Sequence, residues 1–588
     1  MTSINPKRHI LTVALEDYFQ VGAFNTVIQH GQWYRFETRL EKNAERALDL
    51  LDRHGIKATF FVLGWIADRF PELVRKVAER GHEIASKGYY HRAIGQMTPS
   101  EFKDDCIRSR EALECASGRR VIGYRVANGW FHESDLWALD ALTELGFEYD
   151  SSIAPIRGTF AKQPFRRRLH DHTFNGKVIL EVPISTSRIL GMQVPVAGGN
   201  YLRQLPPFLI RRAVSDWHNN VDAPLVAYFH VWELDPEQPK ISAGGWLSHL
   251  RHYRNLNKME GYLEYLFQRY AFTGAANYLG LSTEPERVES GAPSSNRSRP
   301  RLWQPIETKA NAVQSNGPRT PISIVIPCYN EELILPYLAN TLKSVEQKLS
   351  KDYAPTFILV DDGSKDGTWE GMRKTFADKP GFELCRHEVN RGVAAAILTG
   401  IGKATTEIVC SMDCDCTYDP HELADMIPLL KPGVDLVTAS PYHPEGEVRN
   451  VPGWRLKLSK GASWLYRRVL RQKLYTYTSC FRVYRRSTIV DLRITRNGYL
   501  GIAEMLGRLD LRGSKIVEFP ATLEVRMLGR SKMKTLRTIA GHLRLMARLG
   551  RMRLSDWWSH PSDSQPTPPS PTQAPYPNLK SEPLAVAR

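Results

Sequence analysis

The sequence predicts an α/β protein with two domains, each built on a mostly parallel sheet. Three observations predict this class. The chain has 588 residues, too many for one hydrophobic core. Short apolar runs alternate with amphipathic, helix-like stretches in both halves of the chain. A stretch over 283–320, rich in Pro, Ser, Gly, Asn and charged residues, separates the halves and reads as a disordered linker.

The first segment, 1–282, contains apolar runs bounded by turn residues, which predict buried strands. Amphipathic stretches that end in glycine follow some of them and predict helices. The strand-like runs are HILTVAL at 9–15, KATFFVLG at 57–64 and LVAYFHVW at 225–232, and the helix-like stretches are 44–55 and 71–81.

The second segment, 321–535, repeats this alternation. Three runs predict successive buried strands: ISIVIPCYN at 322–330, TFILVDDGS at 356–364 and EIVCSMDCD at 407–415. Ligands of open parallel sheets bind at the carboxyl ends of the strands, so we expect the functional residues of this segment there.

The chain ends in two further segments. Residues 536–558 have an apolar stripe and a basic stripe at helical spacing, which predicts a basic amphipathic helix. Such a helix either lies on an anionic membrane or docks on the domain, and both readings stay open. Residues 559–588 are rich in Pro and Ser and are expected to be disordered. The stripes of the helix are Leu536, Ile539, Leu543 and Met546, and Arg537, Arg544 and Arg551, followed by Trp557 and Trp558.

The composition narrows the class of partner. A formal net charge of +16 favours anionic partners such as phosphorylated substrates or an acidic membrane surface. Basic repeats and Arg-rich tails are absent, so we expect no nucleic-acid partner. The chain has no run of 18 apolar residues and no apolar signal region near its start. Its eight scattered cysteines suggest no disulfide framework, which favours a reducing cytoplasm.

Carboxylates follow each of the three predicted strands of the second segment. Asp413 and Asp415 alternate along one stretch, so their side chains point the same way. They can converge on a hard cation, Mg²⁺ or Mn²⁺, that grips a diphosphate. Cys410, Cys414 and Cys416 surround this pair, but a hard cation prefers the carboxylates to thiolates.

The motifs PCYNEE, VDDGSKDGT, NRGVAAAILTG, MDCDCTYDP, TYTSCFRVYRR and GRSK occur in this order between Pro327 and Lys532. With them the second segment resembles glycosyltransferase family 2, closest to the dolichyl- and polyprenyl-phosphate sugar transferases. The resemblance implies a GT-A, Rossmann-like fold and a nucleotide-sugar donor. It implies that Asp413 and Asp415 hold the metal, with Asp415 catalytic, and that Thr417 replaces a common glutamine ligand. The residues implied to hold the nucleotide are Pro327, Tyr329, Glu331 and Asp362.

The same resemblance places a basic stretch beside the acceptor phosphate. Arginine suits this role, because its forked guanidinium binds phosphate in a bidentate manner. An acceptor phosphate is already ionised at neutral pH and can attack without a base. A hydroxyl acceptor needs a carboxylate base, for which Glu504 is the candidate, the alternative being a glutamate on a helix surface. The residues expected at the acceptor phosphate are Arg449, Arg455, Arg526 and Lys532.

The first segment carries TVALEDYFQ, TFFVLGW, HEIASKGYYH, GYRVANGWF, YDSSIAP, EVPIST and YFHVWELDPEQP in order. With them it resembles the polysaccharide deacetylase (NodB-homology) family, in particular its branch from exopolysaccharide loci. The resemblance implies a distorted (β/α) barrel. It implies a base at position 14, a metal carboxylate at Glu16 or Asp17, and metal-binding histidines at positions 87 and 91. An arginine at 125 and a late histidine at 230 complete the implied site, and both are present.

Two of these positions hold residues that cannot do the implied chemistry. Ala14 cannot take a proton, and Lys87 puts a cation where a metal ligand belongs. Since His91 remains without its partner histidine, we expect a degenerate deacetylase site that does not bind Zn²⁺, with the ammonium of Lys87 filling the metal's place. The rival reading is an active enzyme with a relocated metal site.

Together these observations predict an inverting, metal-dependent transferase that moves a sugar from a nucleotide donor to a phosphate-bearing, lipid-linked acceptor such as polyprenyl phosphate or a glycolipid. We expect it on the cytoplasmic face of the cell membrane, in polysaccharide or glycolipid biosynthesis. The alternatives are a bifunctional deacetylase and transferase, and a non-catalytic scaffold of a polysaccharide assembly complex. The sequence does not choose between UDP and GDP donors, and leaves the sugar, the acceptor and the oligomeric state open.

Overall fold

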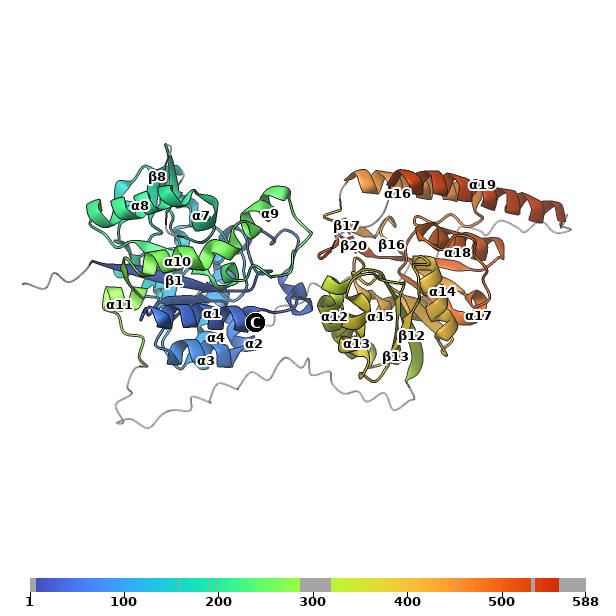
Figure 1. The fold of residues 1–588 in the computed structure, drawn as a ribbon, viewed down its shortest axis with the longest axis horizontal. Coiled ribbons are helices and arrows are strands. Elements are labelled where there is room, and N and C mark those ends of the chain that lie inside the picture. Colours follow the sequence, from blue (N-terminus) through green and yellow to red (C-terminus); the bar gives the residue numbers. More distant parts are fainter. Residues whose placement is uncertain are drawn as a thin grey trace, which may run out of the picture.

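The computed structural model describes residues 7–156, 158–189, 191–196, 198–285, 319–451, 453–529 and 535–559. They form two α/β units that lie next to each other, the first from the N-terminal and the second from the C-terminal half of the chain (Figure 1). The fold class predicted from the sequence is confirmed. Most of the predicted linker, 286–318, and of the predicted tail, 560–588, lies outside the described residues.

The first unit is built on one large sheet with the strand order β10-β1-β2-β3-β4-β5-β7-β6. Strand β11 pairs with the first residues of β1. All pairs are parallel except β6 with β7. The strands are β1 Arg8–Leu15, β2 Thr59–Val62, β3 Glu83–Ser86, β4 Gly123–Tyr124, β5 Tyr149–Asp150, β6 His170–Phe174, β7 Lys177–Glu181, β10 Val226–His230 and β11 Ala271–Thr273.

This sheet curls into an incomplete barrel. No ladder joins β7 to β10 among the described residues, but the chain after β7 reaches β10 through side-chain and bridge contacts. The amide of Val226 donates to Ser185 Oγ at 2.8 Å, and Gly198 forms a single parallel bridge with Tyr228. The barrel is therefore distorted, and the carboxyl ends of β1, β3 and β10 face one shared opening.

Helices lie on both sides of β1 (Figure 1). The sequence delimits α4 clearly: Thr98 caps it with a hydrogen bond from the amide of Glu101, and Gly118 ends it at φ +68°. The helices are α1 Leu40–Arg53, α2 Gly64–Arg69, α3 Pro71–Glu79, α4 Pro99–Ser117, α5 Trp137–Glu144, α6 Gly158–Ala161, α7 Gly199–Gln204, α8 Pro207–Asn220, α9 Trp246–Tyr253, α10 Met259–Phe267 and α11 Ala275–Leu279; the short helix η1 spans His30–Arg35, and β8 Thr186–Ile189 pairs with β9 Met192–Pro195.

The second unit has a seven-stranded sheet of order β14-β13-β12-β15-β18-β16-β19, in which only β18 is antiparallel to its neighbours. The first strand, β12, lies between β13 and β15, so the strand order reverses beside it and opens a crevice at the carboxyl ends. The strands are β12 Thr320–Cys328, β13 Tyr353–Asp361, β14 Phe382–Arg386, β15 Ile408–Ser411, β16 Leu436–Ser440, β18 Arg482–Arg485 and β19 Ile516–Pro520; β17 Glu447–Arg449 pairs with β20 Thr522–Glu524.

The last helix, α19, spans Thr535–Ser559 and runs beside α16 along the upper edge of the second unit (Figure 1). It docks on the unit, because Leu545, Met546 and Leu549 are buried in a core shared with α16 and α18. The docked reading of this segment is therefore correct for that face, while Ile539, Leu543 and Leu554 stay exposed. The side chains of Leu536, Arg537, Trp557 and Trp558 lie outside the described residues.

The other helices of the second unit are α12 Leu335–Leu349, α13 Thr368–Phe376, α14 Val393–Lys403, α15 Leu423–Met426, α16 Gly453–Val469, α17 Arg486–Ile489 and α18 Tyr499–Leu511, with the short helix η8 at Pro420–Glu422. Across the described part of the chain, none of the helices combines the length and apolar character needed to cross a membrane.

Candidate functional site

A cavity of about 950 Å³ opens at the carboxyl ends of β12, β13 and β15, where the sequence predicted a site. One end of the cavity is polar and the other is apolar. The polar end contains every nucleotide- and metal-binding candidate named from the sequence together with one arginine from the acceptor set: Pro327, Tyr329, Glu331, Asp362, Asp413, Asp415 and Arg526. The structure thus brings together residues that are up to 199 positions apart, from Pro327 to Arg526.

Three carboxylates and one guanidinium meet at the polar end. Arg526 Nη1 lies 3.3 Å from Asp415 Oδ2, and its Nη2 contacts Glu331 Oε2. Burial, together with the nearby charge of Asp415, raises the pKa of Asp413 to about 7. Arg526 therefore neutralises part of a site whose carboxylates repel one another.

The donor set fits a hard divalent cation that arrives with a diphosphate. Asp413 and Asp415 supply oxygen ligands, and Mg²⁺ commonly takes one or two carboxylates with substrate phosphates rather than a complete protein cage. The described residues contain no cluster of three or more His, Cys, Asp or Glu side chains placed to hold a metal alone. Burial raises the thiol pKa values of Cys410 and Cys416, and a hydrogen bond with Cys328 together with burial raises the thiol pKa of Cys414. The thiols therefore stay neutral, and the carboxylates are the better candidate ligands.

Asp362 lines the cavity, but its carboxylate is already engaged. Its two oxygens accept hydrogen bonds from His387 Nδ1 at 2.7 Å, Asn390 Nδ2 at 3.0 Å and the amides of Arg391 and Gly392 at 2.8 and 2.7 Å. A carboxylate has about four acceptor positions. Asp362 therefore shapes the turn before α14, and its role in holding the nucleotide stays a prediction.

The turn shaped by Asp362 depends on Gly392. This residue has φ +99°, and a Cβ atom there would lie 2.5 Å from the carbonyl oxygen of Asn497. The same carbonyl accepts from the amides of Ala394 and Ala395 at 2.8 and 3.2 Å. The start of α14 thus lines the cavity through Gly392 and Val393, but the amides of Ala394 and Ala395 are satisfied within the protein.

A second polar cluster lies in the first unit, at the carboxyl ends of β1, β3 and β10. Glu16 is buried at its centre and contacts the ammonium of Lys87. His91 Nε2 lies 3.6 Å from Glu16 Oε2, and His230 Nε2 lies 3.4 Å from Glu16 Oε1. The lysine side chain therefore binds a carboxylate that His91 and His230 both face.

The protonation of this cluster follows from burial and from Lys87. Burial alone would raise the pKa of Glu16, but the charges of Lys87, His230 and His91 bring it below its usual value. Burial lowers the pKa of His91 to about 4, so this imidazole is neutral at pH 7. The charges of Lys87 and Glu16 balance each other beside neutral His91, so the cluster needs no metal ion for charge balance.

The structure resolves the choice between Glu16 and Asp17. Asp17 points away from the cluster and accepts from Thr38 Oγ1 at 2.7 Å and from the amide of Arg39 at 2.9 Å. It therefore holds the chain before α1, and its assignment as a metal ligand is corrected.

Ala14 and Arg125 complete the positions implied by the resemblance. Ala14 is buried and offers no functional group. Arg125 donates to Thr12 Oγ1 and Ser151 Oγ, each at 2.8 Å, and its guanidinium lies 4.1 Å from the centre of the Phe61 ring. Arg125 thus ties strands together.

Three family models match the chain. A polysaccharide deacetylase model matches residues 32–149, a domain of unknown function (DUF3473) matches 151–280, and a glycosyl transferase family 2 model matches 323–493. A polyprenol monophosphomannose synthase of Mycolicibacterium smegmatis is 31% identical over 217 residues, which cover 36% of this chain and 80% of the relative.

The chain belongs to glycosyl transferase family 2.

Two further proteins are similar to parts of the chain. A dolichol-phosphate mannosyltransferase of Pyrococcus furiosus is 30% identical over 230 residues, or 39% of this chain, and the chain spans 63% of that relative's length. The crystal structure of glucosyl-3-phosphoglycerate synthase from Mycobacterium tuberculosis, in complex with Mn²⁺, UDP and phosphoglyceric acid, has 20% identity and a TM-score of 0.30, and covers 42% of this chain and 80% of the synthase.

The structure of this family 2 protein corrects the general base proposed from the sequence. Glu504 is fully buried in α18 and is absent from the cavity lining. Its carboxylate accepts from Arg508 Nε at 2.8 Å, from the amide of Arg496 at 2.9 Å, and from Thr495. Glu504 therefore ties α18 to the preceding loop and is not available to deprotonate an acceptor.

The acceptor residues are only partly brought together. Arg526 and Lys457 line the cavity, whereas Arg449 pairs with Glu447 at 2.7 Å and is absent from the lining. Arg449 is thus corrected to a residue of the β17 edge. The side chain of Arg455 and the whole of Lys532 lie outside the described residues.

The apolar end of the cavity was not foreseen as part of the site. It lies between α16 and α19 and is lined by Leu458, Ala462, Trp464, Leu465, Ile539, Leu543 and Met546. Trp464 is 53% exposed and Leu543 is 52% exposed, which is high for such apolar side chains. The apolar stripe on 536–558 was visible in the sequence, but its position beside the carboxylates required the fold.

Proposed function

We propose that this family 2 protein transfers a sugar from a nucleotide-sugar donor to the phosphate of a lipid-linked acceptor such as polyprenyl phosphate. The observation that carries the proposal is the cavity with two unlike ends. A carboxylate pair and Arg526 lie at one end, and exposed apolar side chains lie at the other. A donor diphosphate matches the first end, and an isoprenoid chain matches the second.

Relatives support this substrate class. Proteins described as polyprenol monophosphomannose synthase, dolichol-phosphate mannosyltransferase and undecaprenyl-phosphate mannosyltransferase share 29–31% identity with the second unit. Each of these names describes the attachment of mannose to a lipid phosphate. We therefore favour a phosphate acceptor over a hydroxyl acceptor.

The proposed reaction is a single displacement with inversion. An oxygen of the acceptor phosphate forms a bond to the anomeric carbon, while the bond from that carbon to the donor diphosphate breaks. The nucleoside diphosphate leaves with the electron pair. An acceptor phosphate is ionised at neutral pH, because its second pKa is about 6. No general base is needed, which agrees with the buried and occupied carboxylate of Glu504.

The protein's own groups would orient the donor and stabilise the leaving charge. Asp413 and Asp415 would hold Mg²⁺ or Mn²⁺, which supplies positive charge to the departing diphosphate. Arg526 contacts Asp415 and Glu331 in this structure and can turn its fork to the diphosphate when the carboxylates bind the cation.

We further propose that the protein binds the surface of an anionic membrane through α16 and α19. Leu458, Trp464 and Leu543 are exposed beside the cavity mouth, and Leu554 is exposed farther along α19. Arginines border these apolar side chains: the Arg468 guanidinium lies 4.0 Å from the centre of the Trp464 ring. Apolar and cationic side chains on one surface suit the headgroup region of acidic lipids.

The first unit is proposed to be a pseudo-deacetylase. The pairing of Lys87 with Glu16 supports this proposal, because a bound ammonium occupies the carboxylate that a metal would need. The bifunctional alternative requires Zn²⁺- or Co²⁺-dependent acetate release from chito-oligosaccharides by the full chain. We expect none, and chelator-sensitive release would establish the bifunctional enzyme instead.

A donor panel tests the transferase proposal. UDP- and GDP-sugars are incubated with polyprenyl phosphate in detergent, with Mn²⁺, with Mg²⁺ or with EDTA, and lipid-linked sugar is measured. We expect product from at least one donor, dependent on the divalent cation. Absence of product from every donor, with intact full-length protein, would refute the proposal.

A further inference from the structure

The first unit grips the loops that form the cavity of the second unit. The short helix η1, His30–Arg35, packs against α12 and reaches the chain that follows Asp413 and Asp415. A separate segment around Ser242 reaches the chain that follows Arg526. Both contacts fall on the transferase site although the first unit contributes no residue to the cavity lining.

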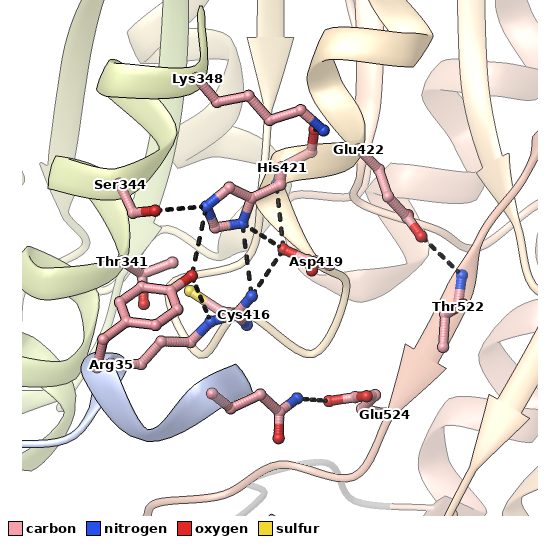
Figure 2. A network of polar contacts seen from close by, with 12 residues as sticks. Arg35, Thr341, Ser344, Lys348, Cys416, Asp419, His421, Glu422, Thr522 and Glu524 are labelled. Atoms are coloured by element: carbon pink, nitrogen blue, oxygen red, sulfur yellow. Dashed lines mark hydrogen bonds and ion pairs between the residues drawn. The ribbon is translucent and has the colours of Figure 1, made fainter. Parts of the chain in front are cut away.

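Arg35 is the centre of the first contact (Figure 2). It is only 4% exposed, and its Nη2 lies 2.9 Å from Asp419 Oδ1. Asp419 also accepts from the amide of His421 at 3.1 Å and from His421 Nδ1 at 2.7 Å. His421 is in turn hydrogen-bonded to Ser344 of α12 at 2.9 Å. A buried guanidinium from one unit thus fixes a network that belongs to the other.

The network continues directly into the metal-binding loop. Asp419 follows Asp415 by four residues, and between them Cys416 has the left-handed backbone angle φ +51°. The amide of Thr417 donates to Asp415 Oδ1 at 3.2 Å. A short loop that contains an unfavourable backbone angle keeps one shape only when its ends are held. Arg35 holds the end that is distal to the carboxylates.

The same short helix, η1, also forms a hydrogen bond with strand β20. Gln32 Nε2 donates to Glu524 Oε2 at 2.7 Å. The amide of Glu524 donates to the carbonyl of Thr417 at 2.8 Å, so this strand is bonded to the metal-binding loop. Figure 2 shows Glu524 and Asp419 on either side of Arg35 and Cys416. The metal-binding loop and strand β20 are therefore both bonded to helix η1 of the first unit.

The second contact holds Arg526. The amide of Ser242 donates to the carbonyl of Met527 at 2.6 Å, and Ile241 forms an antiparallel bridge with Leu528. Arg526 Nε donates to the carbonyl of Leu528 at 2.6 Å. The orientation of this guanidinium thus depends on a backbone segment that pairs with the first unit.

We propose that the first unit is a built-in positioning partner of the transferase site, with Arg35 as the positioning residue for the loop from Asp413 to Asp419 and the Ser242 segment positioning Arg526. This inference assigns a role to a unit whose own polar cluster is closed by Lys87. It rests on the proposed transferase function for its kinetic readout, but the order of the two loops can be measured without any substrate.

The test uses the full chain and compares Arg35→Ala with Arg35→Lys and with Arg53→Ala. Arg53 is a matched control, because it is an arginine of the first unit whose side chain is 53% exposed and pairs with Glu260 and Glu264 of the same unit. Hydrogen–deuterium exchange is followed in peptides covering 413–419 and 522–529 without donor. The Mn²⁺ concentration for half-maximal transfer and the maximal rate are then measured separately.

We expect Arg35→Ala to speed exchange in both peptides and to raise the half-saturating Mn²⁺ concentration by about fivefold or more, the lower range of typical coupling between sites. Arg35→Lys should recover part of the effect, and Arg53→Ala should match the wild type. Asp419→Asn should reproduce the loss, and the double variant Arg35→Ala with Asp419→Asn should be no worse than either alone, because both act through one contact.

Unchanged exchange in 413–419 and 522–529, with a lowered melting temperature as the sole effect of Arg35→Ala, would overturn the inference. If Arg35→Ala does not fold, Gln32→Glu places a second carboxylate against Glu524 at a half-buried site and must speed exchange in 522–529. If the wild type transfers no sugar, the transferase proposal fails while the exchange data still decide the positioning role.

Discussion

Lys87 pairs with the buried Glu16 at a position where the resemblance to deacetylases implies a metal-binding histidine. Its ammonium takes the place of a cation beside Glu16, which would otherwise be a buried carboxylate facing two histidines. Breaking a buried ion pair by removing one partner typically costs 3–5 kcal/mol, because the remaining charge is left unpaired. Removing one partner of the Lys87–Glu16 pair is therefore expected to destabilise the first unit.

Lys87→Met keeps an unbranched side chain, one atom shorter, and removes its charge. We expect the free energy of unfolding to fall by about 3 kcal/mol or more at pH 7, with the loss reduced in Lys87→Met with Glu16→Gln, which leaves no charge unpaired. Urea unfolding of the full chain measures both variants. Equal stability of Lys87→Met and wild type would show that the pair contributes nothing.

Glu233 gives the first unit a stability that depends on pH. Burial would raise its pKa, but the charge of Arg203, whose Nε lies 2.8 Å away, lowers the pKa of Glu233 to about 2. A carboxyl pKa below its unfolded value of 4.5 stabilises the fold above pH 4.5, and this contribution is lost as the pH falls toward 2.

Glu233→Gln should remove this dependence. The shift from 4.5 to about 2 corresponds to roughly 3 kcal/mol at neutral pH, at 1.36 kcal/mol per pKa unit. We expect the variant to unfold at lower urea than the wild type at pH 7, and the gap to narrow between pH 4.5 and pH 2.5. A gap that stays constant over this range would contradict the assignment.

At the scale of elements, the strands were predictable and the roles of individual carboxylates were not. The runs at 322–330, 356–364 and 407–415 became β12, β13 and β15, because apolar runs bounded by turn residues are local signals. The saturation of Asp362 and the burial of Glu504 depend on partners such as His387 and Arg508. Those contacts exist only after the chain has folded.

Helix α19 docks on the second unit with one face, and membrane binding by its exposed face stays a proposal. Leu545 and Leu549 are buried against α16 and α18, so removal of the whole helix would expose core residues and disturb the unit. The contribution of the exposed face is better tested by single substitutions. Leu554 suits this purpose, because it is 60% exposed and absent from the cavity lining.

Leu554→Glu should weaken binding to liposomes that contain acidic lipid, since it places a carboxylate where an apolar side chain would enter the headgroup region. Leu333→Glu is the matched control, because Leu333 is 69% exposed and lies before α12. Co-sedimentation at low and high salt measures the effect, and the binding of wild type should weaken with salt. Equal sedimentation of both variants would show that Leu554 of α19 does not contribute to membrane binding.

At the scale of the whole molecule, the first unit contacts the loops that line the cavity of the second unit. The sequence located both units and most of the polar residues, but gave no signal for the contacts of Arg35 with Asp419 or of Ser242 with Met527. These contacts join residues more than 280 positions apart, and no periodicity or motif records such pairing. The first unit is consequently best understood through what it touches in the second.

We propose that the carboxylate pair and the apolar end of the cavity form one transferase site for a lipid phosphate. The most direct measurement is cation-dependent transfer of labelled sugar to polyprenyl phosphate, compared with the unphosphorylated polyprenol, by wild type and by Asp415→Ala. We expect product with the phosphate alone, and a loss in Asp415→Ala of both transfer and Mn²⁺-dependent nucleotide binding. Transfer to polyprenol, or unchanged Mn²⁺–nucleotide affinity in Asp415→Ala, would contradict the proposal.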